Sequence, residues 1–162
     1  MIDSGMEGLE RKSSMKVSIR HMTSTDYTAC QRVAVAAARS SYAQFLSPEL
    51  LQKVTNPASP LDQVELRLIA EVNGSVAGFV EINGSHIETL FVDPQYQGMG
   101  VGADLLNAAE RCVEGDVTLS VFTVNPRARA FYERHGYMLT GTKEVRFHGV
   151  LVEVWTFVKR RR

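Results

Sequence analysis

The segment from Leu90 to Gly102 constrains this chain more than any other part of the sequence. It has the pattern of an apolar strand, a proline at Pro94, a short polar turn and three glycines that lead into a helix (Gly98, Gly100 and Gly102). Glycines at a strand-to-helix turn let backbone N–H groups approach a ligand closely, and the helix N-terminus adds a partial positive charge. The segment therefore predicts a phosphate-binding loop and a phosphorylated small molecule as its ligand.

Three kinds of phosphate loop have to be compared with this segment. A Walker loop needs a Lys followed by Ser or Thr, but here Gly102 is followed by Ala103 and Asp104. A dinucleotide-binding loop tolerates Ala103 at its third glycine position, although it normally follows the first strand of its unit, and here several strand-like segments come earlier. The third pattern is Gln97-x-x-Gly100-x-Gly102, in which Gln97, the glycines and the next amides surround a pyrophosphate. A glycine-rich turn without a ligand also stays open on this evidence.

A second motif runs from Asn125 to Tyr137 and predicts a short helix with both ends marked. Asn125 is a favourable N-cap, Pro126 suits the first helical position, and Gly136 suits a left-handed C-cap. The helix would carry Phe131 and Tyr132 side by side near its C-terminal end.

Together the two motifs resemble those of the GCN5-related N-acetyltransferase (GNAT) family. The glycine loop, with Val92-x-Pro94 before it and Leu105-Leu106 after it, is similar to the acetyl-CoA loop of that family. Residues 125–137 are similar to its Asn-x-x-Ala-x-x-Phe-Tyr-Glu-x-x-Gly-Phe signature, with Tyr137 in place of the last Phe. The resemblance covers roughly Lys16 to the C-terminus and is strong from Ile87 to Tyr137.

Hydrophobic periodicity and turn residues predict an α/β fold in the order β-α-α-β-β-β-α-β-α-β-β. The expected strands are 16–20, 67–72, 76–82, 86–92, 117–122, 146–148 and 151–158, and the expected helices follow Asp26, Ser47, Gly100 and Asn125. Asn73-Gly74 and Asn83-Gly84 predict tight hairpins, while the helix after Gly100 requires its flanking strands to be parallel. The result is a mixed, mostly antiparallel central sheet with helices on both faces, as the GNAT resemblance also implies. In that family the parallel pair splays at a bulge, and the apolar residues Ile87, Leu90 and Val92 are compatible with a bulge or with burial on both faces.

The resemblance also implies site residues and acetyl-CoA as the acyl donor. Tyr132 would protonate the leaving thiolate, although it could instead be an aromatic core residue, and Glu88 would accept the ammonium proton or attract a cationic substrate. Glu81, His86, His148 or solvent are alternative bases. Asn125 would contact the pantetheine arm in addition to capping its helix, and Arg127 and Arg129 would reach the phosphates. The full set expected to bind the coenzyme is Leu90, Phe91, Val92, Gln97, Gly98, Met99, Gly100, Val101, Gly102, Ala103, Asn125, Ala128 and Tyr132.

Bulk properties limit the class of protein. The chain has 162 residues, the length of one domain, which we expect over residues 15–162. Residues 1–14 are polar and mixed and precede a strand-like segment, which predicts a flexible extension. The formal net charge of zero and the pI of about 6.9 predict no nucleic-acid partner. No segment has the pattern of a secretory signal or a membrane span, which predicts a cytoplasmic protein without a membrane contact. Cys30 and Cys112 are expected to be buried free thiols, and no Cys/His cluster has metal-site spacing. Monomer and homodimer both stay open.

The leading prediction is an acetyl-CoA-dependent N-acetyltransferase that transfers the acetyl group to a primary amine by direct attack. The alternative is a non-catalytic acyl-CoA sensor of the same fold, and a nicotinamide-dependent enzyme is disfavoured by the late position of the glycine loop. The GNAT resemblance implies that residues 38–60, which include Tyr42, Phe45 and Leu46, select the acceptor, but no pattern there names it.

Overall fold

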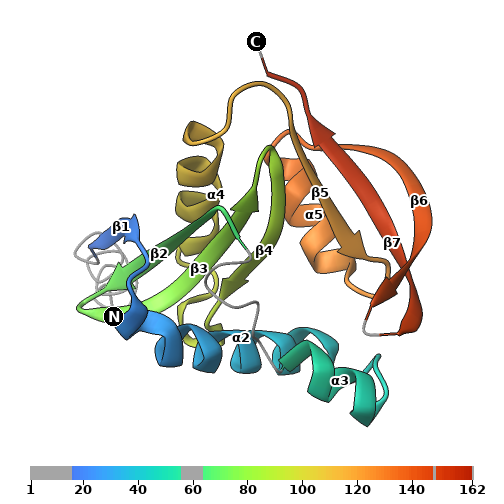
Figure 1. The fold of residues 1–162 in the computed structure, drawn as a ribbon, viewed down its shortest axis with the longest axis horizontal. Coiled ribbons are helices and arrows are strands. Elements are labelled where there is room, and N and C mark those ends of the chain that lie inside the picture. Colours follow the sequence, from blue (N-terminus) through green and yellow to red (C-terminus); the bar gives the residue numbers. More distant parts are fainter. Residues whose placement is uncertain (1–15, 56–63, 148, 162) are drawn as a thin grey trace, which may run out of the picture.

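The computed structural model describes residues 16–55, 64–147 and 149–161 (Figure 1). The expected extension over residues 1–14 lies outside these ranges. The elements in chain order are β1 (Val17–His21), the 3₁₀ turn η1 (Ser24–Asp26), α2 (Tyr27–Tyr42), α3 (Pro48–Thr55), β2 (Leu66–Val72), β3 (Ser75–Asn83), β4 (His86–Val92), the 3₁₀ turn η3 (Pro94–Tyr96), α4 (Val101–Arg111), β5 (Val117–Phe122), α5 (Pro126–Arg134), β6 (Met138–Phe147) and β7 (Val150–Lys159).

The strands form one seven-stranded sheet in the order β1-β2-β3-β4-β5-β7-β6. All neighbouring strands are antiparallel except β4 and β5, which are parallel and are joined through α4. The tight turn between β2 and β3 has positive φ at both Asn73 and Gly74 (51° and 80°), the conformation that favours Asn-Gly. The predicted mixed sheet and its parallel pair are confirmed.

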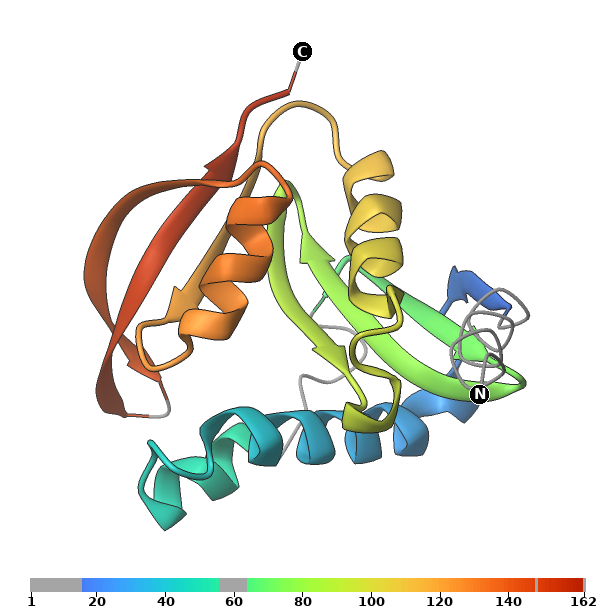
Figure 2. The ribbon, with the colours of Figure 1, turned by 180° about the vertical axis from the view of Figure 1, so that it is seen from behind.

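Helices cover both faces of the sheet. Leu68, Ala70 and Val80 belong to the core cluster that also contains Leu105 and Leu106 of α4. The alternate residues Ile69 and Phe79 belong to the other cluster, with Val33 and Ala34 of α2. Because successive strand side chains point to opposite faces, α4 and α2 must lie on opposite sides of the sheet. Figure 2 shows α4 and α5 together on one face of the sheet.

The sheet opens between β4 and β5, which is the feature that positions the site (Figure 1). These strands pair only at His86 with Thr118 and at Ile87 with Leu119. On the other edge of β4, the register with β3 shifts so that Glu81 pairs with Thr89 and Ile82 with Ile87, which leaves Glu88 as an extra residue. The bulge therefore lies at Glu88, between Ile87 and Leu90, where the apolar residues depart from strict alternation, because an inserted residue inverts the alternation of everything that follows it.

Some predicted boundaries are wrong. Strand β6 begins at Met138, not at residue 146, and was missed because most of its side chains are exposed, so it shows no apolar alternation. Helix α4 ends at Arg111, which places Cys112 beyond the helix and in solvent, not in the core. Cys30 is buried as expected. His148 lies outside the described residues.

Candidate active site

A cleft of about 1050 Å³ enters the sheet where β4 and β5 separate. Its walls come from β4 and β5, from the glycine loop and the start of α4, from α5, and from the face of α2 that carries Cys30, Ala34 and Tyr42. Strand β6 also lines the cleft, through Lys143, Val145 and Phe147. The cleft thus brings both sequence motifs together with Ser41, Tyr42 and Lys53 of the predicted acceptor region, whereas Phe45 and Leu46 do not line it.

The glycine loop has the geometry of an anion-binding site. Gly98 and Gly100 have φ of 78° and 84°, and a Cβ added to either glycine would meet no atom within 4 Å. Gly100 is the N-cap of α4 and its carbonyl accepts from the Asp104 amide at 3.0 Å. The amides of the first turn have no partner within a helix, so those of Val101, Gly102 and Ala103 are available to a phosphate.

Gly102 lies in a different environment from the other two glycines. A Cβ on Gly102 would come within 3.4 Å of the Phe131 ring and 3.6 Å of Val92, which are ordinary van der Waals contacts. Gly102 therefore lies where α4 packs against α5 and β4. Gln97 also has a local role, because its side-chain amide donates to the Val92 carbonyl at 3.3 Å and ties the loop to the end of β4.

The edge of β4 that faces the opening carries backbone donors. The Asp93 amide donates to Ala77 of β3 at 2.8 Å. Since N–H groups alternate in direction along a strand, the amides of Leu90 and Val92 point to the opposite edge, where β5 has left the sheet. The Gln97 bond to the Val92 carbonyl is on this same edge, which agrees with that assignment. These amides are placed to bind a ligand carbonyl or the negative charge that develops on it.

Tyr132 is both a core residue and a cleft residue. It is 8% exposed, and its ring packs edge-to-face against Phe131 and Tyr137 with centroids 5.1 and 5.6 Å apart. The structure gives its hydroxyl no hydrogen-bond partner within the described part of the chain, although every fully buried side-chain N or O atom there has one. Its hydroxyl therefore reaches the cleft, whose lining includes Tyr132. Burial, with a smaller contribution from Tyr42, raises the pKa of Tyr132 well above its usual range, so the phenol stays protonated.

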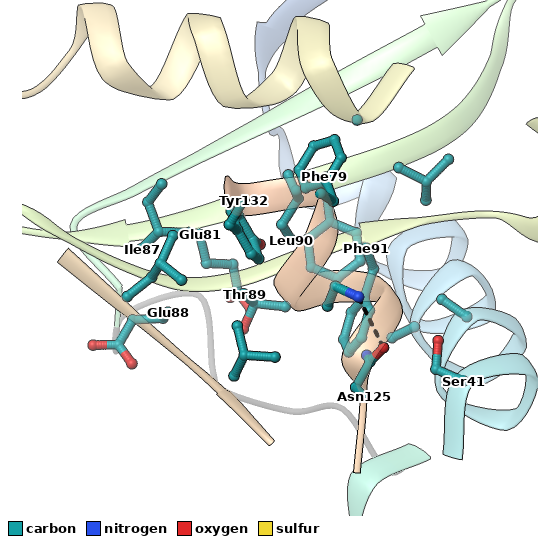
Figure 3. Close-up of a pocket in the computed structure, with 18 of the residues that line it drawn as sticks. Ser41, Phe79, Glu81, Ile87, Glu88, Thr89, Leu90, Phe91, Asn125 and Tyr132 are labelled. Carbon is teal, nitrogen blue, oxygen red and sulfur yellow. Dashed lines mark hydrogen bonds between the residues drawn. The ribbon is translucent and has the colours of Figure 1, made fainter. Parts of the chain in front are cut away.

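Asn125 caps α5 as predicted and also contacts α2. Its Oδ1 accepts from the Ala128 amide at 3.0 Å, and its Nδ2 donates to the Tyr42 hydroxyl at 3.1 Å. Figure 3 shows Asn125 at the start of α5. The bond to Tyr42 joins residues that are 83 positions apart.

The two candidate carboxylates have different environments. Glu81 is buried and forms an ion pair with Arg67, which donates through Nε at 2.8 Å and through Nη2. Glu88 is exposed at the bulge, with Asn83 Nδ2 at 3.5 Å, and Figure 3 shows its carboxylate turned away from Tyr132. Glu81 is thus held by a cation, whereas Glu88 is open to water.

Cationic side chains predominate along the cleft. The lining includes the charged residues Lys53, Arg67, Glu81, Glu88, Arg127, Arg134 and Lys143. Arg129 lies elsewhere: its guanidinium is 4.7 Å from the centre of the Trp155 ring and pairs with Glu133 at 2.6 Å. Of the two arginines expected to reach phosphates, only Arg127 lines the cleft.

Two further side chains that line the cleft, Cys30 and His86, bear on how an acyl group could be transferred. Burial raises the pKa of the Cys30 thiol to about 11, so Cys30 in the cleft is a poor nucleophile. His86 lies at the closed end of the opening, with Nδ1 2.8 Å from the Thr118 hydroxyl. This arrangement suits direct transfer between two bound substrates better than transfer through a cysteine.

Sequence reasoning missed Arg67 and gave Tyr42 only a general place in the acceptor region. Arg67 stands in an apolar strand, where a single arginine followed by Glu81 on the next strand could have indicated a cross-strand pair. The pair can be identified only once the register of β2 against β3 is known. No local pattern indicated the contact between Tyr42 and Asn125.

Comparison with known proteins agrees with this geometry. Residues 26–153 match the family model described as "Acetyltransferase (GNAT) domain". The chain belongs to the GNAT family of N-acetyltransferases. Among curated relatives, peptidyl-lysine N-acetyltransferase YjaB of Escherichia coli (strain K12) is 31% identical over 102 residues, which are 62% of this chain and 69% of that protein. YjaB of Salmonella typhimurium is 37% identical over 68 residues, 42% of this chain, and that match spans only 46% of the relative's length.

Solved structures share the GNAT fold. A GCN5-related N-acetyltransferase from Rhodopseudomonas palustris superposes with a TM-score of 0.78 at 24% identity, covering 89% of this chain and 95% of that one. Apo YjaB from Escherichia coli gives 0.73 at 25% identity, with 88% and 97% covered. The PaiA N-acetyltransferase from Thermoplasma acidophilum, solved with coenzyme A, gives 0.70 at 20% identity, with 90% and 99% covered. Among the described residues of this GNAT protein, no helix is long and apolar enough to cross a membrane.

Proposed function

We propose that this GNAT protein transfers the acetyl group of acetyl-CoA to a primary amine by direct attack. The observation that carries the proposal is the cleft itself. It joins a glycine loop at a helix N-terminus, the open edge of β4 and the Tyr132 hydroxyl in one continuous space, and this hydroxyl has no hydrogen-bond partner in the described part of the chain.

Of the residues predicted to bind the coenzyme, all except Met99 line the cleft. The amides of Val101, Gly102 and Ala103 would hold the pyrophosphate, with Arg127 adding positive charge beside them. The Leu90 and Val92 amides would bind carbonyl oxygens, and the apolar walls would surround the arm. Acetyl-CoA supplies the activated acyl group, and the open space above Gly98 and Gly100 is what a phosphate needs to approach the backbone.

In the proposed reaction the amine nitrogen forms a bond to the acetyl carbon and the carbon–sulfur bond breaks. The β4 amides stabilise the negative charge on the carbonyl oxygen. The hydroxyl of Tyr132 donates to the departing sulfur, and the proton that the ammonium loses passes through water to Glu88 or to solvent. The carboxylate of Glu81 is a weaker candidate base, because Arg67 already occupies it.

A peptidyl lysine is the acceptor that we propose first, because the curated relatives carry that description. The test is thiol release from acetyl-CoA in the presence of lysine-containing peptides, small amines and polyamines. We expect release that depends on an amine, with mass spectrometry showing the acetylated product. Tight acetyl-CoA binding without turnover on any amine would instead support the non-catalytic acyl-CoA sensor.

Replacing Gly100 by Val tests the loop. Valine at φ of 84° is strained, and its branched side chain would occupy the open space above the loop. We expect the affinity for CoA to fall at least tenfold, which is about 1.4 kcal/mol, as measured by calorimetry. The matched control is Gly115→Val, which places the same residue at φ of 78° outside the cleft lining. Equal CoA affinity in wild type and a folded Gly100→Val variant would remove the loop from the site.

Replacing Glu88 by Gln tests the base. The change keeps the shape and removes the charge at the bulge. If Glu88 takes the ammonium proton, the acidic limb of the pH–rate profile should move or disappear in this variant, as measured by turnover across the pH range. Glu144→Gln, which changes an exposed carboxylate outside the cleft lining, should leave the profile unchanged. A rise in the Michaelis constant for the amine with unchanged turnover would limit Glu88 to attracting the cation.

A further inference from the structure

The orientation of the Asn125 side chain determines the direction of its bond to Tyr42. The Ala128 backbone amide can only donate, so the atom 3.0 Å from it must be the Asn125 oxygen. The other branch is therefore the NH₂ group, which lies 3.1 Å from the Tyr42 hydroxyl. An NH₂ group can only donate, so the Tyr42 oxygen accepts. The helix cap thus fixes the orientation that the positions of the heavy atoms alone would leave ambiguous.

This direction leaves the Tyr42 proton to be donated to another group. The structure contains no hydrogen bond from the Tyr42 hydroxyl to an acceptor in the described part of the chain, and Tyr42 lines the cleft. Its ring is held edge-to-face against Phe122, with centroids 5.4 Å apart. The hydroxyl is therefore a donor of fixed position that faces the ligand space.

The location of the Tyr42 hydroxyl within the cleft indicates which part of the acyl donor it would contact. Tyr42 and Tyr132 both line this cleft. Tyr132 is the group that the proposed function places at the sulfur of the acyl donor. The pantetheine arm next to that sulfur carries amide carbonyl oxygens, which accept hydrogen bonds. Asn125 already uses one donor on Tyr42 and one acceptor site on Ala128, and the Tyr42 hydroxyl beside it offers a further donor to an arm that runs along α5.

We infer that Tyr42 binds the acyl donor by donating a hydrogen bond to an amide carbonyl of the pantetheine arm, and that Asn125 orients it. The inference rests on the proposed function, since it requires CoA in the cleft. It assigns Tyr42, at the end of α2, to coenzyme binding and not to acceptor selection. It also makes Asn125 a positioning residue that acts on the arm through Tyr42.

Calorimetry with CoA and with 3′-phospho-ADP, which is CoA without its arm, separates arm contacts from phosphate contacts. For Tyr42→Phe we expect the CoA affinity to fall about fivefold, the size of one neutral hydrogen bond, with the 3′-phospho-ADP affinity unchanged. Gly100→Val should weaken both ligands. Wild-type protein that fails to bind CoA would contradict the proposed function, whereas CoA binding that Tyr42→Phe leaves unchanged would overturn only the role of Tyr42.

Asn125→Asp tests the direction of the bond without removing the phenol. Aspartate caps a helix as well as asparagine does, but it has no proton to donate, so the Tyr42 hydroxyl would donate to it and turn away from the arm. We expect a CoA-specific loss of about fivefold, again from one hydrogen bond, and no further loss when Asn125→Asp is added to Tyr42→Phe. Additive losses would mean that Asn125 contacts the arm itself and would overturn the positioning role. Equal thermal midpoints for the variants and wild type would show that the cap is intact.

Discussion

Turnover of the Tyr132→Phe variant at saturating acetyl-CoA is expected to fall about a hundredfold, the low end of the range for loss of a general acid. The hydroxyl has no partner in the described structure and reaches the cleft, so its removal should cost the fold little. Its buried environment keeps the phenol protonated, which suits a donor to a developing thiolate. The effect should appear in turnover more than in the Michaelis constant for acetyl-CoA, because the interaction strengthens as the thiolate forms.

A neighbouring phenol provides the matched control for this variant. The Tyr137 ring packs against Tyr132, but its hydroxyl donates to Glu110 at 3.0 Å, away from the cleft lining. Tyr137→Phe should therefore lower the free energy of unfolding and leave turnover close to that of wild type. Turnover of Tyr132→Phe within about twofold of wild type, far short of the effect of a lost general acid, would assign Tyr132 to the core alone.

The second large effect is expected from Glu81→Leu, which leaves the Arg67 guanidinium in a buried site without its carboxylate. Both side chains are less than a tenth exposed. Removing one partner of a buried ion pair typically costs about 3–5 kcal/mol of stability, because the remaining charge stays desolvated. Urea unfolding of Glu81→Leu should show this loss in the free energy of unfolding.

Two further variants separate the charge effect from packing. Arg67→Met combined with Glu81→Leu replaces the pair by apolar groups, and it should recover much of the stability, because neither charge is then buried. Glu133→Gln removes the carboxylate from the exposed pair with Arg129 and should change stability by less than about 1 kcal/mol. A Glu81→Leu variant as stable as Glu133→Gln would show that water already solvates Arg67.

Sequence reasoning was most successful where a structure depends on neighbouring residues. The cap of α5 depends on Asn125 and on the backbone amide only three residues away. The Asn73-Gly74 turn depends on two adjacent residues that both have positive φ. The glycines before α4 likewise have left-handed conformations that the residue type indicates directly. The parallel pair of β4 and β5 followed from the helix between them, since connectivity restricts strand direction.

Other features depend on contacts that the order of residues does not contain. The bulge at Glu88 depends on the register of β4 against β3, and a shift by one residue changes which side chains face the cleft. Strand β6 is held by its hydrogen bonds to β7, and most of its side chains are exposed. Its sequence therefore shows no alternation of apolar and polar residues. The direction of the Tyr42 proton depends on an amide 83 positions away. Local conformation could be predicted because caps and turns are short-range interactions, whereas the site required the tertiary structure because its donors and charges are oriented by residues distant in the sequence.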